Sequence, residues 1–139
     1  MSFREKLHWA AFLGIAAAFG WYFLAYPWAM VGTRAGVAAV AGMLVVVTII
    51  IVVVMSVVAA TLAIRYPMEA HLKEDERERG IHLRGTHAAY YPLVLGVYAN
   101  IVAVFNGWSG AALLNLLIAT VVIAELVRVG WQLWLYRRN

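Results

Sequence analysis

An unbroken apolar run at residues 37–64 constrains the fold more than any other feature of the sequence. The run is 28 residues long, carries no charged side chain and is rich in valine and isoleucine. Its β-branched residues suit a buried strand in water, but a run of this length favours a helix in lipid. About 20 helical residues cross the ~30 Å hydrocarbon core of a bilayer. The run therefore predicts a membrane-spanning helix that tilts or extends past the membrane.

Three further apolar segments, at residues 7–30, 88–105 and 111–135, are also long enough to cross a bilayer. The composition agrees, because 65% of the residues are hydrophobic and 13% are charged, whereas a soluble chain carries about 25% charged residues. Only helices and closed barrels satisfy their backbone in lipid, and the sequence lacks the alternating strands of a barrel. The sequence predicts an all-α helical membrane protein, with four transmembrane helices in one domain over residues 1–139.

Basic residues are distributed unevenly between the two sides of the predicted membrane. Ten of the eleven lie on the side that holds both termini and residues 65–87, and only Arg34 lies on the other side. The positive-inside rule then places both termini and the 65–87 segment in the cytosol. This topology accounts for the pI of ≈ 9.7, so we expect no nucleic-acid partner. The partner that the sequence predicts directly is the lipid bilayer.

Residues 65–87 hold ten of the eighteen charged side chains, five of each sign. This balance predicts a salt-bridged helix and not a patch that binds anionic lipid. Pro67 suits a first helical position and Gly80 suits a stop, so we expect a short cytosolic helix over about residues 67–79. Four pairs of opposite charge lie three or four residues apart along it: Glu69–Lys73, Glu74–Arg77, Asp75–Arg79 and Glu76–Arg79.

The charged segment has two interpretations. It can be a solvated connector, or it can dock a cytosolic protein or a neighbouring subunit. Docking is favoured by a helical spacing that places four side chains on one edge, provided that the intervening glycines leave the helix unbroken. These side chains are Arg77, Ile81, Arg84 and Tyr91. The predicted docking residues are Asp75, Glu76, Arg77, Arg84 and Tyr91.

Two patterns carry a resemblance to a known family. The first is D-E-R-E-R at residues 75–79, followed by Ile81, Arg84 and A-Y-Y at 89–91. The second is N-L-L at 115–117, A-E-L-V-R at 124–128 and L-W-L-Y-R-R at 133–138. Together they resemble a family of small bacterial four-helix membrane proteins without an established activity, often encoded beside helix-turn-helix regulators. The resemblance implies a bacterial membrane protein with a role in signalling or regulation. Together with the positive-inside topology, it predicts the bacterial inner membrane with both termini in the cytosol.

Several polar residues lie within the predicted spans. Glu125, Arg128 and Gln132 share one face of the last span, and Asn115 lies a few turns before them. Asn100 and Tyr98 on the third span are candidate partners. Charged residues inside a bilayer are functional candidates by default. The favoured interpretation is an ion pair that holds the last helix in the bundle, and the alternative is a Glu125 that binds a proton or a cationic substrate.

Four histidines lie on the predicted cytosolic side: His8, His71, His82 and His87. His8 and His87 begin the first and third spans, where they can meet and ligate a haem or a metal. Ordinary anchoring at the membrane interface is the favoured interpretation, so we predict no cofactor and no metal site. The chain has no cysteine, which leaves no thiolate ligand.

The remaining patterns define the functional expectation. Small-residue registers permit close helix contacts and suggest a homo-oligomer: Ala10/Gly14/Ala18, Ala16/Gly20, Gly32/Gly36 and Ala38/Gly42. No phosphate loop, nucleophile elbow or pair of catalytic carboxylates occurs in the sequence. We therefore expect a non-enzymatic inner-membrane protein that acts on a partner through its charged loop. The alternatives are a small transporter or channel subunit that uses Glu125, and an accessory subunit of a larger membrane complex.

Overall fold

The computed structural model describes residues 1–138, and every regular element in this part of the chain is helical. The elements are α1 (Phe3–Ala25), the short 3-10 helix η1 (Trp28–Met30), α2 (Arg34–Arg65), α3 (Pro67–Ala70), α4 (Glu76–Phe105) and α5 (Gly110–Arg138). Helices α1, α2, α4 and α5 are long and apolar enough to cross a membrane. The predicted fold class, an all-α helical membrane protein with four spans and a short helix between the second and third, is confirmed.

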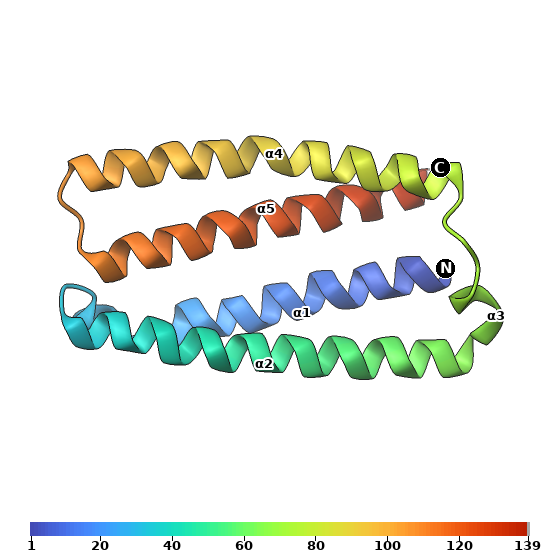
Figure 1. Ribbon diagram of the computed structural model, residues 1–139, viewed down its shortest axis with the longest axis horizontal. Helices are drawn as coiled ribbons and strands as arrows, with labels where there is room; N and C mark the ends of the chain where they lie inside the picture. Colours follow the sequence, from blue (N-terminus) through green and yellow to red (C-terminus); the bar gives the residue numbers. More distant parts are fainter. Residues whose placement is uncertain (139) are drawn as a thin grey trace.

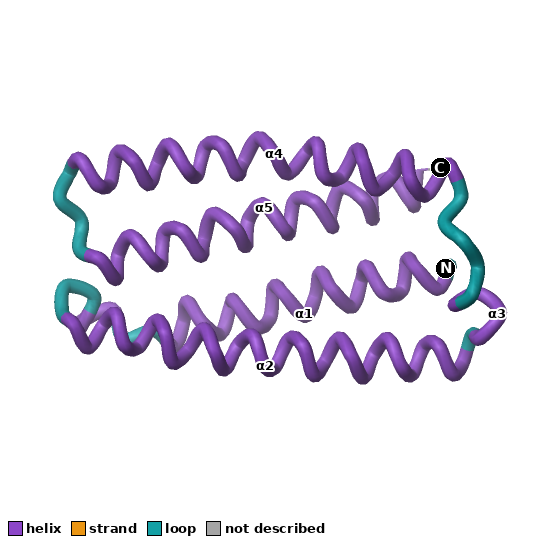
Figure 2. The backbone as a smooth tube through the Cα atoms, in the orientation of Figure 1, coloured by secondary structure: helices purple, strands orange, loops and turns teal. Residues whose placement is uncertain are grey.

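The four long helices lie side by side as a bundle, with both chain termini and α3 at one end (Figure 1). We call this end the terminal end and the opposite one the far end. Helix α4 packs along α5, α5 packs against α1 and α2, and α1 packs along α2. The loops gather at the two ends of the bundle (Figure 2). Helix α5 therefore connects α4 to the α1–α2 pair.

Helix α4 approaches α5 closely at two glycines. A Cβ atom at Gly85 would overlap the side chain of Gln132, and one at Gly96 would overlap the side chain of Thr120. Helices in lipid associate mainly through such close packing, because lipid tails give no hydrophobic drive. The two glycines thus hold α4 close to α5 between Gly85 and Gly96.

At one position, a predicted small-residue register allows a close contact within the chain. A Cβ at Gly36 would overlap the carbonyl group of Met30, and the Gly36 carbonyl accepts a hydrogen bond from the Tyr26 hydroxyl at 2.9 Å. The other glycines in these registers have no neighbouring atom within 4 Å of an added Cβ: Gly14, Gly20, Gly32 and Gly42. Space therefore remains next to each of these four glycines.

One buried apolar cluster lies toward the far end. Tyr22, Tyr26, Val40, Val47 and Ala111 form one buried cluster. Many other large apolar side chains on α2 and α4 point away from the bundle and are exposed. In a membrane these outward side chains meet lipid, which is why a chain this apolar needs only a thin protein core.

The predicted helix over residues 67–79 is wrong in its extent. Helix α3 ends at Ala70, and α4 begins directly after Asp75, whose carboxylate accepts the backbone N–H of Glu78 at 2.7 Å. Helix α4 then passes Gly80 without a break. A glycine in a helix costs about 1 kcal/mol relative to alanine, and the capped start together with the burial of the following residue outweighs that cost.

The predicted ion pairs within the charged segment also differ from the observed ones. Among residues 1–138, none of the four expected pairs lies within 4.0 Å. The carboxylates of Glu74 and Glu78 contact Arg4 of α1 instead. The loop after α3 separates Glu69 from Lys73 and leaves Glu74 outside α4, and the Asp75 carboxylate caps α4.

Candidate functional site

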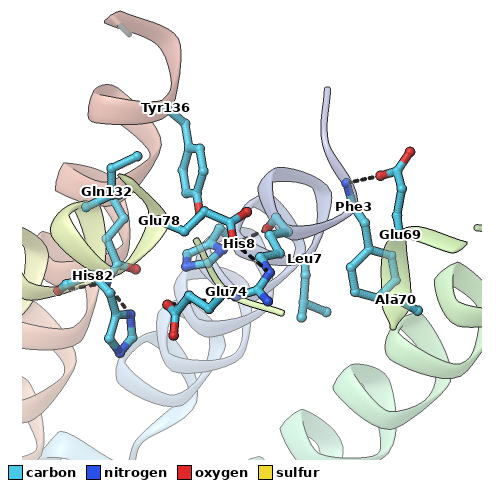
Figure 3. Close-up of a pocket in the computed structure, with 12 residues that line it drawn as sticks. Phe3, Leu7, His8, Glu69, Ala70, Glu74, Glu78, His82, Gln132 and Tyr136 are labelled. Atoms are coloured by element: carbon cyan, nitrogen blue, oxygen red, sulfur yellow. Dashed lines mark hydrogen bonds and ion pairs between the residues drawn. The ribbon is translucent and has the colours of Figure 1, made fainter. Parts of the chain in front are cut away.

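A polar cavity of about 360 Å³ lies at the terminal end, between α1, α3, α4 and α5 (Figure 3). Four apolar side chains complete its wall: Phe3, Leu7, Ala70 and Ile81. Its polar wall consists of Arg4, His8, Glu69, Glu74, Glu78, His82, Gln132 and Tyr136. These side chains come from parts of the sequence far apart, so the cavity exists only in the folded bundle.

The first turn of α1 binds the charged segment. Arg4 lies 3.2 Å from Glu78 (Nε to Oε2) and 3.7 Å from Glu74 (Nη1 to Oε1), and it donates to the Leu72 carbonyl at 3.2 Å. The backbone N–H of Phe3 donates to the Glu69 carboxylate at 2.8 Å, as Figure 3 shows. The amide groups of a first helical turn lack partners within their helix. Exposed ion pairs stabilise little one by one, but these four contacts together tie α3 and the start of α4 to α1.

Gln132 is the most enclosed polar side chain of the cavity wall, with 0% of its surface exposed. Its amide nitrogen lies 3.1 Å from His82 Nδ1 and 3.5 Å from the His82 carbonyl oxygen. Because an amide nitrogen only donates, His82 Nδ1 accepts, and the neutral ring carries its proton on Nε2. Gln132 Oε1 is buried and accepts no hydrogen bond from residues 1–138. Trp9 Nε1 and Asn100 Oδ1 are also buried without a partner among residues 1–138, but Gln132 is the one of these three residues that lines the cavity. Because buried acceptors usually have a partner, its position favours a donor bound in the cavity.

His8 provides a second acceptor at the cavity. Its Nδ1 lies 2.7 Å from the Arg4 carbonyl oxygen, so Nδ1 carries the proton in the neutral ring and Nε2 accepts. The His8 ring packs on Tyr136 with a centroid distance of 5.6 Å. Figure 3 shows these two side chains beside Glu78. The polar wall contains two imidazole rings, three carboxylates, one amide, one phenol and one guanidinium group.

Sequence reasoning grouped Gln132 with Glu125 and Arg128, and the structure separates them. Glu125 and Arg128 form the expected pair, with Arg128 Nη2 at 2.7 Å and Nε at 3.0 Å from the same carboxylate oxygen. The side chains are 42% and 30% exposed, respectively. Gln132 turns instead to His82 on α4. The helix face that spacing predicted therefore divides into two parts: Glu125 and Arg128 form an ion pair, and Gln132 lines the cavity.

Asn100 and Asn115 lie apart from that ion pair. Asn100 donates to the Gly96 carbonyl at 2.8 Å and lies 3.4 Å from Thr120 Oγ1. Asn115 accepts from the Tyr22 hydroxyl at 2.8 Å. Both side chains are buried, so they join helices inside the bundle. The predicted five-residue polar cluster is therefore four separate groups in the structure.

The predicted docking residues fall largely on one exposed side of α4. Arg77, Arg84 and Tyr91 lie along it, because α4 is unbroken. Arg84 belongs both to a hollow of about 470 Å³, shared with Glu76, and to a groove of about 800 Å³ that also contains Tyr91. Two details differ from the expectation. Asp75 caps the helix, and Ile81, which sequence spacing placed on this edge, is only 4% exposed.

His8 and His87 do not share a site. His8 belongs to the terminal-end cavity, whereas His87 lines the groove with Arg84 and lies 3.4 Å from the Tyr91 hydroxyl. Residues 1–138 contain no group of three or more His, Asp or Glu side chains that could hold a metal ion. The expectation that the two histidines could meet is therefore wrong, because α1 and α4 present them to different cavities.

Fold and site together define a multi-pass helical membrane protein with a polar cavity and an exposed charged helix edge at one end. Comparison of the chain with protein-family models, with curated proteins and with solved structures gave no match.

Proposed function

We propose that this chain is a non-enzymatic membrane protein that docks a cytosolic protein through one side of α4. The observation that carries the proposal is the exposed line of Arg77, Arg84 and Tyr91 on an unbroken helix. The contact of Gly85 with Gln132 fixes this part of α4 to α5. A rigid surface loses little conformational entropy on binding, which favours affinity.

The proposed orientation places the terminal end in the cytosol of a bacterium, with the four spans in the inner membrane. The ten-to-one distribution of basic residues supports it. The resemblance of residues 75–91 and 115–138 to a family encoded beside helix-turn-helix regulators supports a regulatory partner. Such a partner would meet α4 where the helix leaves the membrane. The glycines on α1 and α2 with no close neighbour in the chain still predict a homo-oligomer.

The test is site-specific photocrosslinking in native membranes. A crosslinking residue at position 84 should capture one protein of defined mass, and the Arg77→Glu substitution should abolish that product without lowering membrane abundance. The matched control is Arg65→Glu, because Arg65 is an exposed arginine at the same end of the bundle but on α2. Loss of the product in both variants, or in neither, would contradict docking on α4.

The transporter alternative is weaker because of the ion pair at Glu125. Both donor nitrogens of Arg128 that contact the carboxylate lie within 3.0 Å of Oε2. A cationic substrate would have to compete with a guanidinium group that is covalently held in place. We therefore propose a structural role for Glu125, in line with the favoured interpretation of the sequence.

A further inference from the structure

The terminal-end cavity has the charge and volume of a ligand site. Its wall carries three carboxylates against one guanidinium group, which gives a formal charge of −2 when both histidines are neutral. The charged edge of α4 lies elsewhere, because Arg77 and Arg84 line other hollows. The volume of about 360 Å³ falls in the range of small-molecule pockets.

The carboxylates of the wall retain capacity for a second cation. Arg4 contacts one oxygen of Glu74 and one oxygen of Glu78, and each carboxylate can accept at its other oxygen. The opposite wall contributes Gln132 Oε1, which is buried without a partner among residues 1–138. The unpartnered oxygen of Gln132 and the acidic side chains are two independent observations. Both favour a ligand that donates hydrogen bonds. The cavity favours a positively charged hydrogen-bond donor.

We propose that this cavity binds a small protonated amine, whose N–H groups donate to Gln132 Oε1 and to the free carboxylate oxygens. The hydrocarbon part of the amine packs on Phe3, Leu7 and the ring of Tyr136, which also line the cavity. Aromatic faces attract organic cations. The site lies between α1, α4 and α5 at the terminal end.

Other ligand classes fit this wall less well. A phosphate or an anionic lipid headgroup would meet a net negative surface. A divalent metal needs several ligands at one point, and residues 1–138 contain no such group of three His, Asp or Glu side chains. A quaternary ammonium ion has the charge but lacks the N–H donor that Gln132 Oε1 calls for. The amine is the class that satisfies both observations.

Three probes with one carbon skeleton test the proposal on the purified full chain in detergent at pH 7. They are 2-phenylethylamine, the neutral 2-phenylethanol, and trimethyl(2-phenylethyl)ammonium, and titration calorimetry measures their binding. We expect the amine to bind at one site per chain, the quaternary ion to bind about tenfold more weakly or worse, and the alcohol not to bind. Loss of one hydrogen bond to a charged group corresponds to about that factor. Equal affinity for the amine and the quaternary ion, or no binding of the amine, would overturn the proposal.

Two substitutions locate the site. Gln132→Leu removes the buried acceptor and should weaken amine binding at least about tenfold. Glu74→Gln, at a side chain that is 45% exposed, should fold normally and weaken binding by a smaller factor. Glu5→Gln is the matched control, since Glu5 lies in the first turn of α1 and does not line the cavity. If Glu5→Gln weakens binding as much as Glu74→Gln, the attraction is diffuse and the site is refuted.

Discussion

Two glycines five residues apart on α4 give opposite predictions for the same substitution. Gly80 has no atom within 4 Å of an added Cβ, whereas a Cβ at Gly85 would lie 2.9 Å from the Arg128 carbonyl oxygen. Alanine stabilises a helix interior relative to glycine by about 0.5–1 kcal/mol, so Gly80→Ala should raise the free energy of unfolding by that amount. Gly85→Ala gains the same term and also forces atoms into a packed contact, which typically costs about 1–3 kcal/mol.

The net expectation for Gly85→Ala is no change to a loss of about 2.5 kcal/mol, from the sum of these two terms. The difference in unfolding free energy between the two variants should therefore be about 1–3 kcal/mol. Reversible unfolding in mixed detergent micelles, followed by circular dichroism for both variants and the unchanged chain, measures it. Equal stability of the two alanine variants would mean that α4 and α5 do not approach as closely as the Gly85–Gln132 contact requires.

Two further predictions concern the ion pair and the orientation. Glu125→Gln should cost about 1–2 kcal/mol of detergent stability, since the pair is partly exposed and Arg128 can extend toward water. Replacing both residues by apolar ones should recover much of that loss, whereas a stable Glu125→Gln variant that has lost proton-coupled flux in liposomes would favour the transporter alternative. Reporter fusions at the carboxyl terminus and within residues 71–75 should report the cytosol, and a tag near Thr33 should report the other side. A mixed report at any of these places would contradict a single orientation.

The four spans were predictable because hydropathy and length alone define a membrane helix. Their number and order agree with the structure. The start of the third helix was not predictable from the same rules, because Gly80 resembles a stop signal. Asp75, as a capping residue, and Ile81, packed into the bundle, decide the outcome. Asp75 can be recognised as a capping residue in the sequence. Whether its cap outweighs the helix-breaking tendency of Gly80 depends on the packing of Ile81, which the sequence does not show.

The partners of the charged residues were harder to predict because they lie far apart along the chain. Pairs three or four residues apart are the only ones that a helical pattern can propose. Arg4 meets its carboxylates across about 70 positions, and Gln132 meets His82 across 50. Spacing placed Gln132 on the correct face of the last span and gave no information about the helix opposite. The small residue at position 85 is the one trace of that contact in the sequence, because a large amide needs space on the neighbouring helix.

The first turn of α1 links the two proposed sites. Arg4 contacts Glu74 and Glu78, which line the cavity and flank the start of α4. A protonated amine in the cavity would share these carboxylates with Arg4 and weaken each contact of the guanidinium group. The connection from α3 to α4 would then be held less firmly to α1, while Gly85 and Gln132 keep α4 against α5. Binding in the cavity is thus expected to act on the segment that leads into the docking edge and to leave the membrane-spanning bundle unchanged.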